Sequence, residues 1–220
     1  TVRALSEVRL VTRRRHEETR SASVKRSRVL HRNRRILAIG TSTGGPPVLQ
    51  RIMSALPADY PWPVVVVQHI SPGFLEGMVD WLDHSCAIRI CAAKNGDSLT
   101  PGVVYLAPDN VHMVVTDEET IALLDAPPDN GLRPAVGRLF QSVADVYDKN
   151  VTAVLLTGMG KDGAPELKQL RDCGAVTVVQ NRETCVVFGM PGEAVRLDAA
   201  MHIMSPDEIA DFLVAEAVRA

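Results

Sequence analysis

Residues 36–45, Ile-Leu-Ala-Ile-Gly-Thr-Ser-Thr-Gly-Gly, join a short apolar run to a glycine-rich turn. From Pro46 to Ala55 the apolar residues then recur at helical spacing. A run of this length suits a strand that is buried on both faces of a sheet, and the glycines permit a tight turn into the helix. The stretch therefore predicts a strand–turn–helix unit of an α/β fold.

The same alternation continues through most of the chain. Apolar runs are found at residues 36–39, 64–67, 103–106, 151–156 and 176–179, and helical spacing at 46–55, 74–84, 135–148, 165–173 and 206–218. Neighbouring parallel strands need a crossover, and each crossover helix covers a face of the sheet. The pattern predicts a doubly wound, mostly parallel sheet with helices on both faces.

One region departs from this alternation. Three short apolar segments, residues 103–107, 111–116 and 120–124, follow one another closely with Pro108, Asp109 and Asp117 between them. Closely spaced strands with turn residues between them are typical of antiparallel pairing. We therefore expect a small antiparallel insertion over about residues 103–124.

Charge divides the chain into a tail and a domain. Residues 1–35 hold 12 Lys and Arg against 3 Asp and Glu, whereas the remainder holds 12 against 23. The segment 1–34 is predicted to be a basic linker, with a short amphipathic helix near its start, and residues 35–220 to be one folded domain. Because the chain begins with Thr1 and not with Met, we expect a longer protein upstream.

Composition argues against several functional classes. The basic tail lacks interleaved aromatic residues, so binding of nucleic acid is not expected, and no apolar run reaches the roughly 18 residues of a membrane span. The four cysteines form no CxxC pair and the histidines no HExxH motif, so no metal site is expected. We expect a monomeric protein in the reducing cytoplasm.

The turn after the first strand carries the first candidate for chemistry. Residues 40–44 fit the motif G-x-S-x-G, in which a serine is exposed between a strand and a helix as a nucleophile. The N-terminus of the following helix offers free N–H groups to a developing negative charge. Ser42 would then attack an acyl carbon.

A phosphate cradle is the alternative reading of this loop, since the same N–H groups would suit a nucleotide. However, no Lys follows the glycines as in a P-loop, and the spacing is not G-x-G-x-x-G. The next strand ends in Gln68 and His69, and not in the acidic residue that would bind a ribose.

A serine nucleophile needs a base and a group that orients the base. His69 ends the second strand, and Asp162 lies in the turn Gly-Met-Gly-Lys-Asp-Gly after the strand at 151–156. Each residue also has an ordinary structural explanation: His69 could be a histidine that is hydrogen-bonded to the backbone, and Asp162 could be the N-cap of the following helix. The usual hydrolase order of Ser, acid and His would need His202, which lies in an apolar stretch and fits a packed or edge residue better.

Six motifs of this domain resemble the protein-glutamate methylesterases of bacterial chemotaxis, the CheB type. They are Gly-Thr-Ser-Thr-Gly-Gly at 40–45, Gln-His at 68–69, Pro-Gly-Phe at 72–74, Leu-Ala-Pro at 106–108, Leu-Thr-Gly-Met-Gly-Lys-Asp-Gly-Ala at 156–164 and Cys-Val-Val-Phe-Gly-Met-Pro at 185–191. The resemblance extends over nearly all of residues 35–220.

This resemblance implies roles and partners. Ser42 would be the nucleophile, His69 the general base and acid, and Asp162 the orienting carboxylate, with the N–H groups of Thr43 and Met159 near the oxyanion. The family implies demethylation of glutamate methyl esters on chemoreceptor helices, with release of methanol, often deamidation of glutamines, and no cofactor or metal. It also implies an upstream receiver domain, phosphorylated by a chemotaxis histidine kinase.

One departure from the family pattern lies before a predicted helix. Relatives commonly read Arg-Pro-Ser-Val-Asp where this chain has Ala135 and Gly137 in place of Ser and Asp. The change removes a hydroxyl and a carboxylate, so substrate positioning could differ and the helix should begin less firmly. A catalytically weak interaction domain with the same fold therefore stays open as a further alternative.

Overall fold

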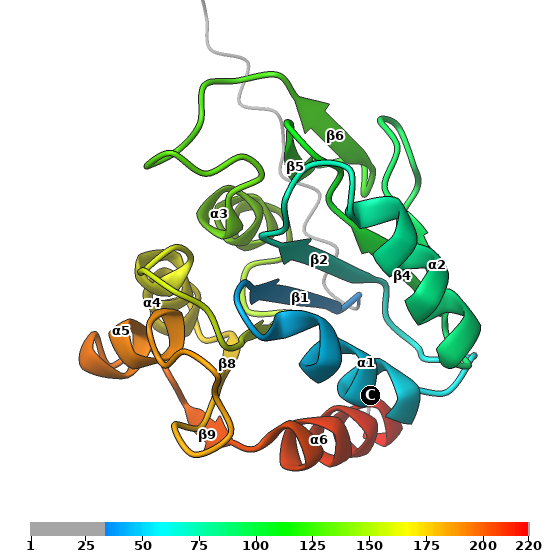
Figure 1. The fold of residues 1–220 in the computed structure, drawn as a ribbon. Helices are drawn as coiled ribbons and strands as arrows, with labels where there is room; N and C mark the ends of the chain where they lie inside the picture. The colour runs from blue at the N-terminus through cyan, green and yellow to red at the C-terminus, as the bar shows by residue number, and fades with distance from the viewer. Residues whose placement is uncertain (1–33, 220) are drawn as a thin grey trace, which may run out of the picture.

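The computed structural model describes residues 34–219 (Figure 1), so the expectations for the basic tail fall outside the described residues. The strands are β1 (Ile36–Thr41), β2 (Val64–Gln68), β3 (Arg89–Ala92), β4 (Val103–Leu106), β5 (His112–Val115), β6 (Ile121–Leu124), β7 (Val151–Leu155), β8 (Val176–Gln180) and β9 (His202–Met204). The helices are α1 (Gly45–Ala55), α2 (Leu75–Ser85), α3 (Val136–Tyr147), α4 (Ala164–Asp172), α5 (Met190–Arg196) and α6 (Pro206–Val218).

Seven strands form one parallel sheet in the order β3-β4-β2-β1-β7-β8-β9, which confirms the predicted doubly wound fold. Helices α1, α2 and α6 pack on one face, and α3, α4 and α5 on the other (Figure 1). β1 lies between β2 and β7, so the strand order changes direction there. Ligand sites of open α/β sheets form at such a point, at the carboxyl ends of the strands.

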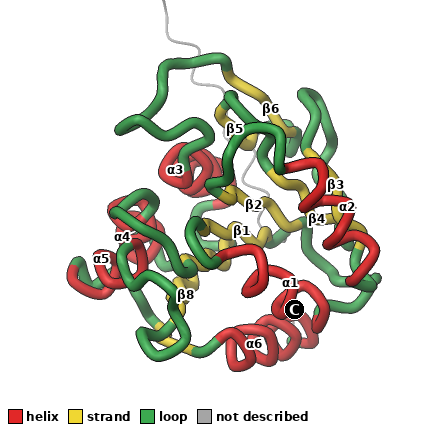
Figure 2. Tube along the Cα trace, in the orientation of Figure 1, coloured by secondary structure: helices red, strands yellow, loops and turns green. Residues whose placement is uncertain are grey.

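The antiparallel insertion is smaller than predicted. Only β5 and β6 pair antiparallel, whereas β4 joins the main sheet in parallel between β3 and β2. Short spacing along the chain indicated antiparallel pairing, but α2 forms the crossover from β2 to β3, and the loop of residues 93–102 leads back to start β4 parallel to both strands. Figure 2 shows the long loop that leads from β6 back to α3.

Three elements were not predicted, namely β3, β9 and α5. β3 and β9 have three or four residues each and lie at the two edges of the sheet, where side chains are only partly buried. Such strands lack the continuous apolar run that signals a central parallel strand. α5 has seven residues, too few to establish a helical period.

Helix α3 illustrates how the second face is held. Leu139, Phe140, Val143 and Tyr147 recur three or four residues apart, and all four are buried against the sheet. Burial of a side chain as large as Phe140 contributes roughly 1.5–3 kcal/mol to folding. This packing fixes the first turn of α3, which lies near the carboxyl ends of β1 and β7.

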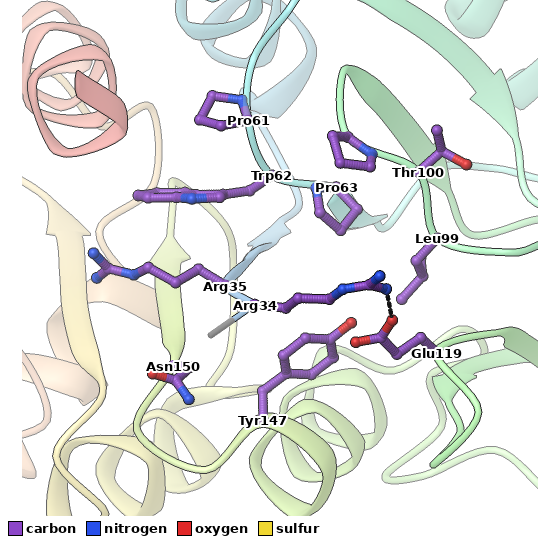
Figure 3. A pocket seen from close by; sticks show the side chains of 11 residues that line it. Arg34, Arg35, Pro61, Trp62, Pro63, Leu99, Thr100, Glu119, Tyr147 and Asn150 are labelled. Atoms are coloured by element: carbon purple, nitrogen blue, oxygen red, sulfur yellow. Dashed lines mark hydrogen bonds and ion pairs between the residues drawn. The ribbon is translucent and has the colours of Figure 1, made fainter. Parts of the chain in front are cut away.

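A hollow of about 770 Å³ opens at the opposite end of the sheet, where the strands begin (Figure 3). Trp62, Leu99 and Tyr147 line it, and Arg34 and Glu119 form an ion pair across it. Its walls come from the segments before β1, β2, β4 and β7, away from the loops that carry the candidate residues.

None of the helices between residues 34 and 219 is long and apolar enough to cross a membrane.

Candidate active site

Strand register brings the loops of Ser42 and His69 together. Thr41 at the end of β1 is paired with Gln68 at the end of β2, so Ser42 and His69 are the next residues on adjacent strands. The N–H of His69 donates to the carbonyl of Thr41 at 2.9 Å, and the N–H of Ser42 donates to the carbonyl of Thr157 at 3.0 Å. Because Thr157 follows β7, the loop that carries Asp162 joins the same edge.

The turn after Ser42 has the form of a nucleophile elbow. Gly44 precedes α1 with φ +83°, and a β-carbon there would lie 2.6 Å from the side chain of Val186. Glycine is thus required by both conformation and space. Ser42 is held between the end of β1 and the N-terminus of α1, as the motif predicted.

Two polar side chains that were not assigned a role tie these loops together. Gln68, which is 3% exposed, donates its Nε2 hydrogens to the carbonyls of Ser42 at 2.9 Å and His69 at 2.8 Å. The hydroxyl of Thr157 donates to the carbonyl of Thr43 at 2.9 Å and accepts the N–H of Val187 at 3.0 Å. In the sequence, such residues could have been identified as polar residues at the end of an otherwise apolar strand.

Asp162 is anchored on the N-terminus of α3. Its Oδ2 accepts the N–H of Val136 at 2.7 Å, and its Oδ1 accepts the N–H of Gly137 at 3.0 Å. Burial alone would raise the pKa of Asp162, but the contact with His69 and these two N–H groups outweigh it, so the pKa is lowered. The carboxylate is therefore held in its ionised form.

The same carboxylate orients His69. Nε2 of His69 lies 3.0 Å from Oδ2 of Asp162, and the two side chains are 11% and 14% exposed. The ring nitrogen Nε2 does not meet the geometry of a regular hydrogen bond to this oxygen, so the contact is a close approach of the two side chains. With Nε2 directed to Asp162, the other ring nitrogen, Nδ1, is left for a proton donor such as serine.

Two other histidines, His202 and His112, occupy structural positions. His202 lies in the edge strand β9 with its ring 5.1 Å from that of Phe212, in the packed edge position expected of it. His112 is buried; its Nδ1 accepts the N–H of Ala135 at 3.3 Å and its Nε2 lies 3.1 Å from the carbonyl of Pro127. His112 thus holds the loop before α3, a structural role.

The departure before α3 does not leave the start of this helix unsatisfied. Ala135 is the N-cap residue and has no side-chain hydrogen bond, as expected. However, Asp162 reaches from another loop and accepts two of the first N–H groups of α3. The candidate catalytic carboxylate therefore also caps the helix, which the sequence did not reveal.

Comparison with known proteins identifies the family of this chain. The model of the CheB methylesterase family matches residues 37–213. The chain belongs to the CheB methylesterase family. A protein of Geobacter metallireducens named protein-glutamate methylesterase/protein-glutamine glutaminase 4 is 47% identical over 99% of this chain and 63% of its own length. The protein named protein-glutamate methylesterase/protein-glutamine glutaminase 1 of Syntrophus aciditrophicus is 48% identical over 81% of this chain and 51% of its own length.

The CheB fold is shared with a solved structure as well. The crystal structure of the Thermotoga maritima CheB methylesterase catalytic domain superposes with a TM-score of 0.81 at 34% sequence identity, covering 83% of this chain and 98% of that one. The chain therefore matches nearly the whole of that solved domain, and it spans less than two thirds of the length of the two relatives named above.

The contacts of Gln68 give a first prediction. We expect Gln68→Glu to lower the free energy of unfolding by about 3 kcal/mol, because a buried carboxyl group would face two carbonyl oxygens in place of an amide donor. Urea denaturation measures the change. Gln169→Glu, at an exposed position of α4, is the matched control, and an equal loss in both variants would contradict the role of Gln68.

Proposed function

We propose that this chain is the catalytic part of a protein-glutamate methylesterase that uses Ser42, His69 and Asp162 as a triad. The observation that carries the proposal is the contact of His69 with Asp162, which is fixed on the N-terminus of α3, next to a serine elbow. An ionised carboxylate that holds the imidazole ring in one orientation is what a serine nucleophile requires.

In the proposed reaction, Nδ1 of His69 takes the proton of Ser42 while Oγ attacks the carbonyl carbon of a glutamate methyl ester. The tetrahedral oxyanion collapses, the methoxy group takes the proton from His69, and methanol leaves. Water, deprotonated by His69, then attacks the acyl-serine. The second tetrahedral intermediate collapses, Oγ takes the proton back from His69, and glutamate and free Ser42 are released. A glutamine side chain would react in the same way with ammonia as the leaving group.

The backbone N–H groups of Thr43 and Met159 are proposed to stabilise the oxyanion. Thr43 directly follows the nucleophile at the N-terminal turn before α1, and Met159 lies in the loop between Thr157 and Asp162. Donors of this kind, aimed at the developing charge, contribute about 10²–10³ in rate each. No cofactor or metal takes part in the proposed reaction, and the expectation that none is needed stays a prediction.

The rim of the site suits a large substrate. Phe74, Met159 and Val186 are 67%, 76% and 67% exposed; they lie in the loops that follow β2, β7 and β8, and Val186 packs beside Gly44. Exposed apolar side chains of this kind favour contact with another protein. We propose that they meet the helices of a chemoreceptor in the cytoplasm, and that the full protein carries an upstream receiver domain that is phosphorylated by a histidine kinase.

Methanol release from a methylated chemoreceptor fragment tests the proposed function. We expect the chain to release methanol and a fluorophosphonate to label Ser42, since both reactions need the same activated hydroxyl. Labelling without methanol release would keep the serine hydrolase but refute the receptor substrate. Absence of both would contradict the enzyme and favour an interaction domain.

A further inference from the structure

Two aromatic side chains are exposed on one face of α2. Phe74, directly before the helix, is 67% exposed and Trp81 is 45% exposed, whereas every other Phe, Tyr and Trp side chain of the chain is buried or half-buried. Seven positions make about two helical turns, so the two side chains project in nearly the same direction, about 10 Å apart along the axis. Exposed aromatic groups of this kind are typical of protein interfaces.

The residue between these aromatics is a glycine that the fold itself does not need. Gly77 lies within α2, where glycine is about 1 kcal/mol less favourable than alanine. A β-carbon added at residue 77 would meet no other atom within 4 Å, and the backbone there is helical. Neither space nor conformation inside the domain therefore requires a glycine. Its visible effect is on the outside, where it leaves a notch between the rings of Phe74 and Trp81.

The domain uses only the inner side of α2. Leu75, Met78 and Leu82 are buried, and the helix packs on β3 and α1. Figure 1 shows α2 on the outside of the layer that it forms with α1 and α6. Glu76 and Asp80 are exposed beside Gly77, and the ion pairs found between residues 34 and 219 include neither of them. The outer face thus combines an apolar stripe, Phe74, Gly77 and Trp81, with an acidic flank.

This stripe begins at the candidate active site. The loop of residues 69–74 leads from His69 directly into α2. Asp109, in the loop after β4, accepts the N–H of Gly73 at 2.7 Å and so holds the end of this loop in place. Phe74 therefore belongs both to the rim of the site and to the stripe. A partner that contacts the rim can continue along α2 without leaving the apolar surface.

We propose that the stripe of Phe74, Gly77 and Trp81 is the surface on which a helix of the methylated chemoreceptor docks. The two rings form ridges, and the notch at Gly77 between them admits an apolar side chain of the receptor helix. The acidic flank fits a helix that carries Lys or Arg beside its apolar residues. This inference rests on the proposed function and adds the place where the substrate is held, which can be measured without turnover.

Tryptophan fluorescence of Ser42→Ala, which cannot form an acyl-enzyme, tests the docking directly. Acrylamide quenching is measured with and without a helical fragment of a methylated chemoreceptor, in Ser42→Ala and in Ser42→Ala/Trp81→Phe. We expect the fragment to lower the quenching constant of Trp81 by about half or more, because docking removes the ring from water. The double variant should not respond, since its remaining Trp62 is 3% exposed and lies at the opposite end of the sheet.

Two results of the quenching experiment would overturn the proposal. One is the absence of protection of Trp81 at a saturating concentration of the fragment. The other is protection that needs no fragment and grows with the concentration of the protein, which would assign the stripe to a second copy of the chain.

The kinetics of methanol release provide a second test. Trp81→Ala should raise KM for the receptor fragment by about tenfold and affect KM more than kcat, because an aromatic anchor of the docked complex is lost. An unchanged KM would contradict the docking surface.

Gly77→Leu separates docking from stability. It should raise the melting temperature, because leucine is favoured over glycine in a helix and the space outside residue 77 is open. It should nevertheless raise KM for the receptor fragment by about tenfold, because the side chain fills the notch. Gln169→Leu adds the same side chain at an exposed position of α4 and should leave KM within twofold. A KM of Gly77→Leu equal to that of Gln169→Leu would show that the notch is not used.

Failure of this inference and failure of the proposed function give different results. A wild-type chain that is labelled by a fluorophosphonate and releases methanol, while the fragment leaves Trp81 unprotected in Ser42→Ala, would keep the methylesterase and refute the docking surface. Protection of Trp81 with an unlabelled wild-type chain would support the docking surface and refute the serine hydrolase.

Discussion

Replacement of Ser42 by Ala is expected to abolish fluorophosphonate labelling and to lower methanol release by roughly four orders of magnitude or more. The hydroxyl is the only group of this residue that can form the acyl bond, and neither His69 nor Asp162 can replace it in that role. Stability should change little, because the bonds that hold Ser42 come from its backbone N–H and carbonyl. Mass spectrometry of the labelled protein and a methanol assay measure both effects.

Ser54→Ala is the matched control for this loss. Ser54 lies near the end of the same helix that follows the elbow, is exposed, and forms a hydrogen bond with Gln50. Its removal should leave labelling and methanol release within twofold of the wild type. Labelling that persists in Ser42→Ala would mean that another residue is the nucleophile.

Replacement of Asp162 by Asn is expected to lower activity by roughly 10³–10⁴-fold and also to destabilise the fold by about 1–3 kcal/mol. Asn has one acceptor oxygen, whereas Asp162 accepts two N–H groups of α3 and contacts His69. The amide hydrogens of the asparagine side chain would then face either a backbone N–H of α3 or the ring of His69. Ser42→Ala should lower activity but not stability, whereas Asp162→Asn should lower both, and this difference distinguishes the role of Asp162.

The stability difference should depend on pH in a defined direction. The pKa of Asp162 is lowered in the folded protein, so its contribution to stability is fully present above the pKa of the unfolded chain, about 4. It is lost as the pH falls through the folded value. Denaturation curves of the wild type and Asp162→Asn should therefore converge below about pH 4, and a constant difference would contradict the proposed cap.

The sequence by itself determined the class of fold and the candidates for chemistry. Apolar runs such as 64–67 and 151–156 identify central strands, because a strand covered on both faces has no polar side. G-x-S-x-G at 40–44 predicted the elbow, because glycine spacing controls local backbone geometry. These signals are local, so they can be detected within a window of a few residues.

The tertiary structure decided which distant groups meet. Three features join segments that lie far apart along the chain: the pairing of β4 with β2, the bridge of Gln68 between two loops, and the cap that Asp162 provides for α3. Their formation depends on strand order and helix packing, which many sequences with the same local pattern could arrange differently. Local periodicity thus determined the elements, and packing determined the environment of each candidate side chain.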